Sequence, residues 1–200
     1  MLTNPIEYLR LYRRHIDTAL QWVTEKDLNS AIILINGAAQ HKLPVYVIGN
    51  GGSASLSQHF ACDHTKAVHA DTYPINKPNV ISLASNIALM TAIANDYSYE
   101  EVFSKQLEYA KNTHKKAVLV AISASGNSPN IVKAIETVRP AWSVLTMTGF
   151  DGGKIKNMGS TNLHIPSHNY GVVEDCHQIL MHSIAQWTRI EFSEKQSLTL

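Results

Sequence analysis

The sequence predicts an α/β fold, a three-layer sandwich in which helices cover both faces of a five-stranded parallel sheet. Five short runs are largely apolar, without the alternation of a half-exposed strand, which is typical of strands that are buried on both faces. Helical segments alternate with these runs, and that alternation indicates parallel strand pairing. Because no linker-like or low-complexity segment divides the 200 residues, we expect one domain over residues 1–200.

Residues 1–42 predict a pair of helices that precedes the sheet. Asn4 is a suitable N-cap, Pro5 fits the first helical position, and apolar residues then recur at helical spacing as far as Val23. A second helix is expected over residues 28–41. The pattern fits helices that pack on the same domain and equally fits helices that contribute to oligomerisation.

From Pro44 onward the chain predicts strands and helices in alternation. The apolar runs place the strands at 44–49, 79–84, 117–123, 143–148 and 161–166. The helices are expected at 53–66, 86–95, 99–111, 131–138 and 172–194. The carboxyl ends of parallel strands meet at one edge of the sheet, where open α/β folds bind their ligands.

Charge and composition exclude several function classes. The formal net charge is +1, so no field of one sign indicates nucleic acid or an anionic membrane as a partner. No segment is apolar enough to span a bilayer, and the amino terminus lacks the apolar core of a signal peptide. Cys62 and Cys176 have no CxxC spacing, so we expect free thiols and a cytoplasmic protein.

Two of the predicted strands end in the same kind of turn. Residues 45–55 (VYVIGNGGSAS) and 118–128 (VLVAISASGNS) each run from a strand through Gly, Asn and Ser into a helix. Backbone N–H groups and serine hydroxyls at helix N-termini can hold a phosphate without Lys or Arg. Either turn alone fits a simple βα turn with a capping serine equally well. Neither a GxGxxG nor a Walker A motif occurs in these turns, so no nucleotide cofactor is expected.

Five segments together resemble the phosphoheptose isomerase branch of the SIS family, and the resemblance covers nearly the whole chain. They are GNGGSASLSQHFACDHTK, TAIANDYSYEEVF, ISASGNSPNIVKAIE, LTMTGFDGGK and VEDCHQILMH. The resemblance implies a SIS domain of flavodoxin-like architecture and a homotetramer with sites near its subunit interfaces. It also implies the conversion of sedoheptulose 7-phosphate to D-glycero-D-manno-heptose 7-phosphate, a precursor of lipopolysaccharide or capsule heptose.

The resemblance also implies which residues contact the phosphorylated sugar. These substrate-binding candidates are Asn50, Gly51, Gly52, Ser53, Asn95, Asp96, Ser123, Ala124, Ser125, Ser128 and Glu174. The family usually has threonine at the position of Ala124, so one hydroxyl donor is missing here.

A cluster of imidazole and carboxylate groups is the candidate chemical centre. His59 and Asp63 are four residues apart, which suits two metal ligands on one helix face and equally suits a surface ion pair. The resemblance adds Glu174 and His182 as metal ligands, with one zinc ion per subunit. It casts Asp63 as the base that moves a proton and His182 as its acid/base partner. Eight residues separate Glu174 from His182, an offset of about 80° on a straight helix.

Two departures from the family leave other functions open. Asp63 stands where the family has a longer glutamate, and Glu174 stands where the family has glutamine. One alternative is a non-catalytic SIS module that binds a sugar phosphate or regulates replication. The other is an isomerase that acts on a different phosphosugar.

Overall fold

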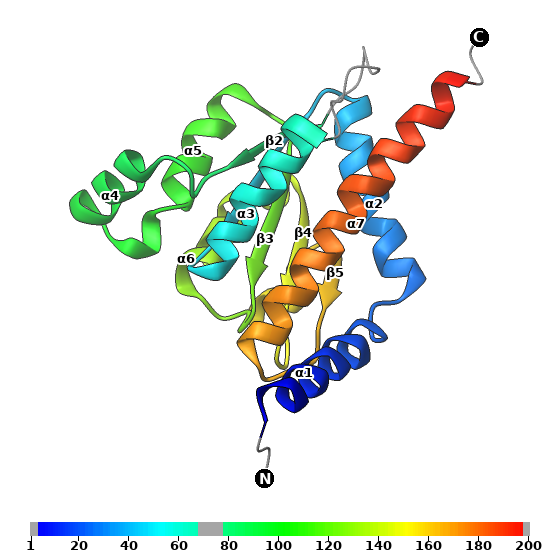
Figure 1. The fold of residues 1–200 in the computed structure, drawn as a ribbon. Helices are drawn as coiled ribbons and strands as arrows, with labels where there is room; N and C mark the ends of the chain where they lie inside the picture. Colours follow the sequence, from blue (N-terminus) through cyan, green and yellow to red (C-terminus); the bar gives the residue numbers. More distant parts are fainter. Residues whose placement is uncertain (1–3, 68–77, 198–200) are drawn as a thin grey trace.

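The computed structural model describes residues 4–67 and 78–197, and its centre is one five-stranded parallel sheet (Figure 1). The strands are β1 (Pro44–Gly49), β2 (Asn79–Ser82), β3 (Val118–Ser123), β4 (Ser143–Thr148) and β5 (Thr161–His164). Their order across the sheet is β2-β1-β3-β4-β5. This is the flavodoxin-like order, and with helices on both faces it confirms the predicted fold class.

Two separate apolar cores bury the two faces of the sheet. On one face Val45 and Val47 of β1 pack with residues from α2 (Glu25–Gln40), α3 (Gly52–Cys62) and α7 (Tyr170–Ser197). On the other face Tyr46 and Ile48 pack with residues from α5 (Ser104–Thr113) and α6 (Pro129–Val138). Every residue of β1 and β3 is buried, as expected for strands covered on both sides.

Two helices lie outside these layers. The first, α1 (Pro5–Leu20), crosses the amino-terminal end of α7 near the carboxyl edge of the sheet (Figure 1). The second, α4 (Ile87–Asp96), projects beside α5 (Figure 1). Asn4 caps α1 by accepting a hydrogen bond from the Ile6 N–H at 2.9 Å. The Tyr12 hydroxyl donates to Asp175 at 2.7 Å and thereby ties α1 to α7. Residues 1–3 of the predicted helical region 1–42 lie outside the described part.

Several predicted elements differ in their bounds. The edge strands β2 and β5 have four residues each, fewer than predicted, because an edge strand gains ladder hydrogen bonds on one side only. The helix predicted at 99–111 begins at Ser104, after a 3₁₀ turn at Tyr99–Glu101, since Val102 and Phe103 are both fully buried where the chain bends. The helix predicted at 53–66 widens into a π-helical turn at Asp63–Ala67.

Candidate active site

The two glycine- and serine-containing turns meet in one cavity of about 280 Å³ at the carboxyl edge of the sheet. Its lining combines both turns with the first residues of α7: Asn50, Gly51, Gly52, Ser53, Ile122, Ser123, Ala124, Ser125, Ser128, Tyr170 and Glu174. The structure therefore brings together nine of the residues that sequence reasoning assigned to the substrate, all except Asn95 and Asp96.

Each turn presents the amino end of a helix to this cavity. Gly51 ends the first turn with φ +53°, a conformation that favours glycine, and α3 starts at the next residue. In the second turn the Ser123 hydroxyl accepts a hydrogen bond from the Gly126 N–H at 3.2 Å and lies 3.4 Å from the Ser128 hydroxyl. The first N–H groups of a helix have no intrahelical partner, so both turns offer donors to an anion.

Asn50 lines this cavity and also makes hydrogen bonds within the protein. Its side-chain amide pairs with the buried amide of Asn130, and its Oδ1 also accepts a hydrogen bond from the Tyr99 hydroxyl at 3.0 Å. The amide of Asn50 thus joins the two turns to each other and to the segment after α4. Asn130 and Tyr99 were missed in the sequence because neither lies in a recognisable motif.

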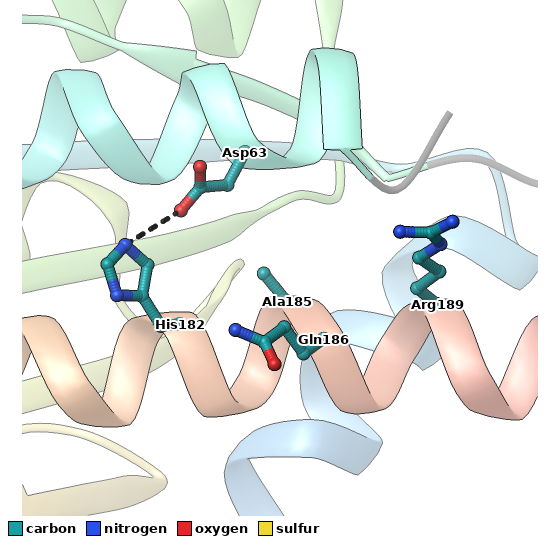
Figure 2. Close-up of a pocket in the computed structure, with 5 residues that line it drawn as sticks. All are labelled: Asp63, His182, Ala185, Gln186 and Arg189. Atoms are coloured by element: carbon teal, nitrogen blue, oxygen red, sulfur yellow. Dashed lines mark ion pairs between the residues drawn. The ribbon is translucent and has the colours of Figure 1, made fainter. Parts of the chain in front are cut away.

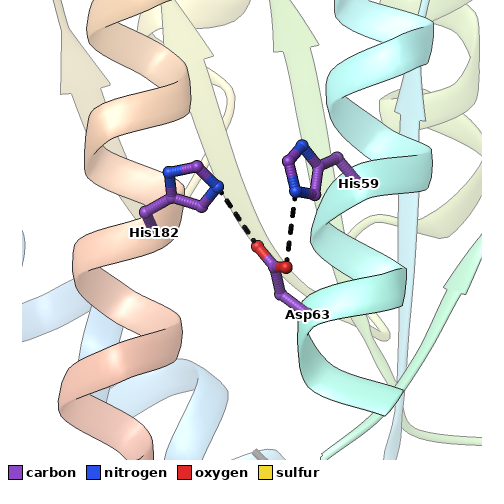
Figure 3. A group of neighbouring side chains, drawn as sticks. All are labelled: His59, Asp63 and His182. Carbon is purple, nitrogen blue, oxygen red and sulfur yellow. Dashed lines mark ion pairs between the residues drawn. The ribbon is translucent and has the colours of Figure 1, made fainter. Parts of the chain in front are cut away.

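His59, Asp63 and His182 form a compact group between α3 and α7 (Figure 3). One ligand atom from each side chain lies within 4.8 Å of the other two. His59 Nε2 is 3.5 Å from Asp63 Oδ1, and His182 Nε2 is 3.5 Å from Asp63 Oδ2. Asp63 Oδ2 is buried and accepts no hydrogen bond within the described residues. A carboxylate oxygen in that position is available to a cation or a proton.

Glu174 lies in the cavity at the turns and is not one of these three converging residues. Its carboxylate packs against Gly52, where an added Cβ would lie 2.5 Å from Oε2. Burial raises the pKa of Glu174 above its ordinary value of 4.5, and the neighbouring charge of Asp175 raises it further. Among the described residues, the set of converging ligand atoms does not include Glu174.

A second cavity of about 220 Å³ continues along the two helices beyond the cluster (Figure 2). It is lined by Asp63, His182, Ala185, Gln186 and Arg189. The turns, the His59–Asp63–His182 group and this cavity therefore follow one another along the line between α3 and α7. From Glu174 to His182 the distance along the α7 axis is about 12 Å.

Comparison with known proteins assigns the family. Residues 7–143 match the SIS domain family. A phosphoheptose isomerase of Helicobacter pylori (strain ATCC 700392 / 26695) is 33% identical over 185 residues, which cover 92% of this chain and 93% of that protein. This chain belongs to the phosphoheptose isomerase branch of the SIS family. The phosphoheptose isomerase of Colwellia psychrerythraea is 42% identical over 144 residues, 69% of this chain and 70% of that protein.

The SIS fold is equally clear from solved structures. The structure of a phosphoheptose isomerase from Neisseria gonorrhoeae is 28% identical, with a TM-score of 0.78, and the match covers 92% of this chain and 95% of that one.

Within the described part of this SIS domain, none of the helices has the length and apolar character that a membrane span needs. Cys62 and Cys176 are both free.

Asn95 and Asp96 lie at the end of α4, and neither lines the two cavities of this SIS domain. The two side chains bond to each other, with the Asn95 amide donating to Asp96 Oδ1 at 2.9 Å. Both are exposed in the single chain. Their contact with substrate stays a prediction.

Proposed function

We propose that this protein is an aldose–ketose isomerase that interconverts sedoheptulose 7-phosphate and D-glycero-D-manno-heptose 7-phosphate. The observation that carries the proposal is the placement of an anion-binding cavity and a carboxylate–imidazole group along the same pair of helices. A sugar phosphate has its phosphate and its carbonyl at opposite ends of its carbon chain. The separation of about 12 Å along α7 suits such a substrate. The similarity to phosphoheptose isomerases supports the same activity.

The phosphate is expected at the two turns. The N–H groups at the start of α3 and the hydroxyls of Ser123, Ser125 and Ser128 would donate hydrogen bonds to its oxygens. These donors carry no charge, so the positive ends of the two helix dipoles supply the favourable field. Glu174 faces the same cavity, and burial raises its pKa. Because the carboxyl group then holds its proton more tightly, its repulsion of a nearby anion is reduced.

The isomerisation moves a proton between neighbouring carbon atoms. A base removes the proton next to the carbonyl, an enediolate forms, and the proton returns one carbon away. Asp63 is the proposed base, because its Oδ2 is buried and accepts no hydrogen bond from the described residues. His182 is the proposed acid/base partner, which moves protons to and from the sugar oxygens. Its Nε2 lies 3.5 Å from Asp63 Oδ2 and thus beside the proposed base.

A zinc ion, one per subunit, is the proposed cofactor. Two imidazoles and one carboxylate with ligand atoms within 4.8 Å of one another form a suitable set for a divalent transition metal, and the unsatisfied Asp63 oxygen fits a cation. When bound, zinc would supply a Lewis acid that polarises the carbonyl oxygen. Glu174 remains a candidate ligand only if its side chain leaves Gly52.

A homotetramer is the proposed assembly, with the sites near subunit interfaces and the helices of residues 1–42 contributing to contacts. Large apolar side chains are exposed on α1 and α7 of the single chain, among them Leu9 (52%) and Trp187 (53%), with Trp22 (67%) just after α1. A neighbouring subunit would cover them and could bring Asn95 and Asp96 to a site. The proposed location is the cytoplasm, which accords with two free thiols.

The test is direct conversion. Purified protein is incubated with sedoheptulose 7-phosphate, with and without added zinc, and the aldose product is followed by NMR. Appearance of the heptose phosphate supports the proposal, and no conversion under either condition contradicts it. Turnover of another substrate in a panel of aldose and ketose phosphates would identify an isomerase for a different sugar. Absent turnover together with a stable protein partner would favour the non-catalytic module.

A further inference from the structure

The segment GFDGG, residues 149–153, follows β4, and none of its residues lines either of the two cavities. It packs backbone to backbone against the second turn. A Cβ added to Gly126 would lie 1.9 Å from the carbonyl oxygen of Gly152. A Cβ added to Gly153 would lie 2.4 Å from the carbonyl oxygen of Ser125. Glycine at these positions therefore allows the segment to approach the turn more closely than any side chain would permit.

Residues 149–155, here called the supporting segment, donate backbone hydrogen bonds to the second turn. The Gly149 N–H donates to the Ala124 carbonyl oxygen at 2.8 Å, and the Ile155 N–H donates to the Gly126 carbonyl oxygen at 3.1 Å. These bonds occupy acceptors of the turn with donors from a segment that does not line the cavity at the turns. The turn thus keeps its own N–H groups and hydroxyls for a ligand.

The side-chain amide of Asn127 joins the turn to the supporting segment at a third point. Its Oδ1 accepts a hydrogen bond from the Lys154 N–H at 3.0 Å, and its Nδ2 donates to the Ser125 carbonyl oxygen at 3.1 Å. The Asn127 backbone N–H also donates to Ser125 Oγ at 3.3 Å. Asn127 itself is exposed and does not line the cavity, so its effect on a ligand there must pass through Ser125.

The bond to Ser125 Oγ determines what that hydroxyl can offer. A serine hydroxyl has one hydrogen to donate and two lone pairs that accept. Because Ser125 Oγ accepts from Asn127, its hydrogen remains free for the cavity that Ser125 lines. Ser123 Oγ accepts from the Gly126 N–H at 3.2 Å in the same way. The oxygens of a phosphate dianion only accept hydrogen bonds, so hydroxyls arranged as donors suit it.

We infer that Asn127 is a positioning residue of the phosphate site, which holds Ser125 against the supporting segment so that the Ser125 hydroxyl donates into the cavity. The inference rests on the phosphate site of the proposed function. It gives the GFDGG segment its part in that site, which is to fix the second turn from outside the cavity.

The test measures binding apart from turnover. The probe is sedoheptulose 7-phosphate with its carbonyl group reduced to an alcohol, because this compound keeps the phosphate and cannot isomerise. Calorimetric titration gives its dissociation constant, and steady-state assays with the unreduced sugar give KM and kcat. We expect Asn127→Ala to weaken probe binding by roughly 10-fold and to raise KM similarly with little change in kcat, since ground-state and transition-state binding are lost equally. A general loss of structure would instead lower kcat and the melting temperature.

A matched pair of variants isolates the bond between Lys154 and Asn127. Lys154→Pro removes the N–H that Asn127 accepts, and Lys154→Ala removes the same side chain but keeps the N–H. Proline suits this position because Lys154 begins a 3₁₀ turn at Lys154–Asn157. We expect Lys154→Pro to bind the probe several-fold more weakly than Lys154→Ala. When residue 127 is already alanine, the two variants should bind equally.

Asn157→Ala, at an exposed position in the same 3₁₀ turn, is the general control and should bind the probe as the wild type does. Wild-type affinity in Asn127→Ala would overturn the inference, as would equal affinities of Lys154→Pro and Lys154→Ala with Asn127 in place. A wild-type protein that does not bind the probe would overturn it too. The expected losses of affinity in a protein that does not isomerise sedoheptulose 7-phosphate would support the inference and contradict the proposed function.

Discussion

The side-chain amides of Asn50 and Asn130 donate hydrogen bonds to each other's carbonyl oxygens, at 2.8 and 2.9 Å. Asn50 belongs to the first turn and Asn130 to the first residues of α6, so this pair fixes the distance between the two proposed halves of the phosphate site. Asn130 is 2% exposed, so its amide lies away from bulk solvent. The geometry of the cavity therefore depends on a residue that does not line it.

Asn130→Ala should weaken sugar phosphate binding and lower stability. It leaves the Asn50 amide without its buried partner, a loss of roughly 1–3 kcal/mol in the free energy of unfolding. Calorimetric titration with the sugar phosphate and thermal unfolding measure the two effects. Asn112→Ala, on the exposed surface of α5, is the control and should change neither. Unchanged binding in Asn130→Ala would show that the turns keep their positions without the pair.

Gly52→Ala should destabilise the protein because the new methyl group meets the Glu174 carboxylate. Replacing Glu174 by Ala in the same chain removes the obstacle. We expect the double variant to regain most of the loss, giving a coupling energy of roughly 1 kcal/mol or more in a double-mutant cycle of unfolding free energies. Purely additive effects would mean that the added methyl group and the Glu174 carboxylate do not interact.

Glu174→Gln should change how stability depends on pH. Burial raises the Glu174 pKa, so the folded protein holds this proton more tightly than the unfolded chain does. The resulting stabilisation is fully present below the unfolded pKa and is lost as pH rises through the folded pKa. The variant should therefore gain stability relative to the wild type as the pH rises above 4.5, the ordinary pKa of this carboxyl group. Chemical denaturation of metal-free protein across this range measures the difference, and a constant difference would refute the assignment.

Asp63→Asn should remove the base while keeping the shape of the side chain. We expect the turnover rate to fall by roughly 10²- to 10⁴-fold, since proton transfer by a positioned side chain contributes about that much. Binding of the phosphate should persist, because the turns are about three helical turns away from Asp63 along α3. Asp17→Asn, exposed on α1, serves as the control. Substantial turnover in Asp63→Asn would assign the base to another residue.

The fold could be predicted from the sequence more fully than the site. Unbroken apolar runs such as PVYVIG require burial on both faces, and that requirement determines a covered parallel sheet. Because the carboxyl ends of parallel strands share an edge, the meeting of the turns at Gly51 and Ser123 was also predictable, and it is confirmed. The start of α5 was misjudged because burial of Val102 and Phe103 overrides local helical periodicity.

The site was harder to predict because its contacts depend on how helices pack. The approach of His182 to Asp63 follows from the parallel packing of α3 and α7, which no local pattern reports. Asn130 follows Pro129 in the first turn of α6, and no spacing relates it to Asn50 eighty residues earlier.

A crystal structure of the Asp63→Asn variant with sedoheptulose 7-phosphate tests the central claim most directly. The account predicts the phosphate in the cavity between the two turns, within hydrogen-bonding distance of the N–H groups at the start of α3 and the hydroxyls of Ser123 and Ser128. The sugar chain should extend between α3 and α7 toward His182. Density for the phosphate in the second cavity beside Arg189, with the cavity at the turns empty of ligand, would contradict it.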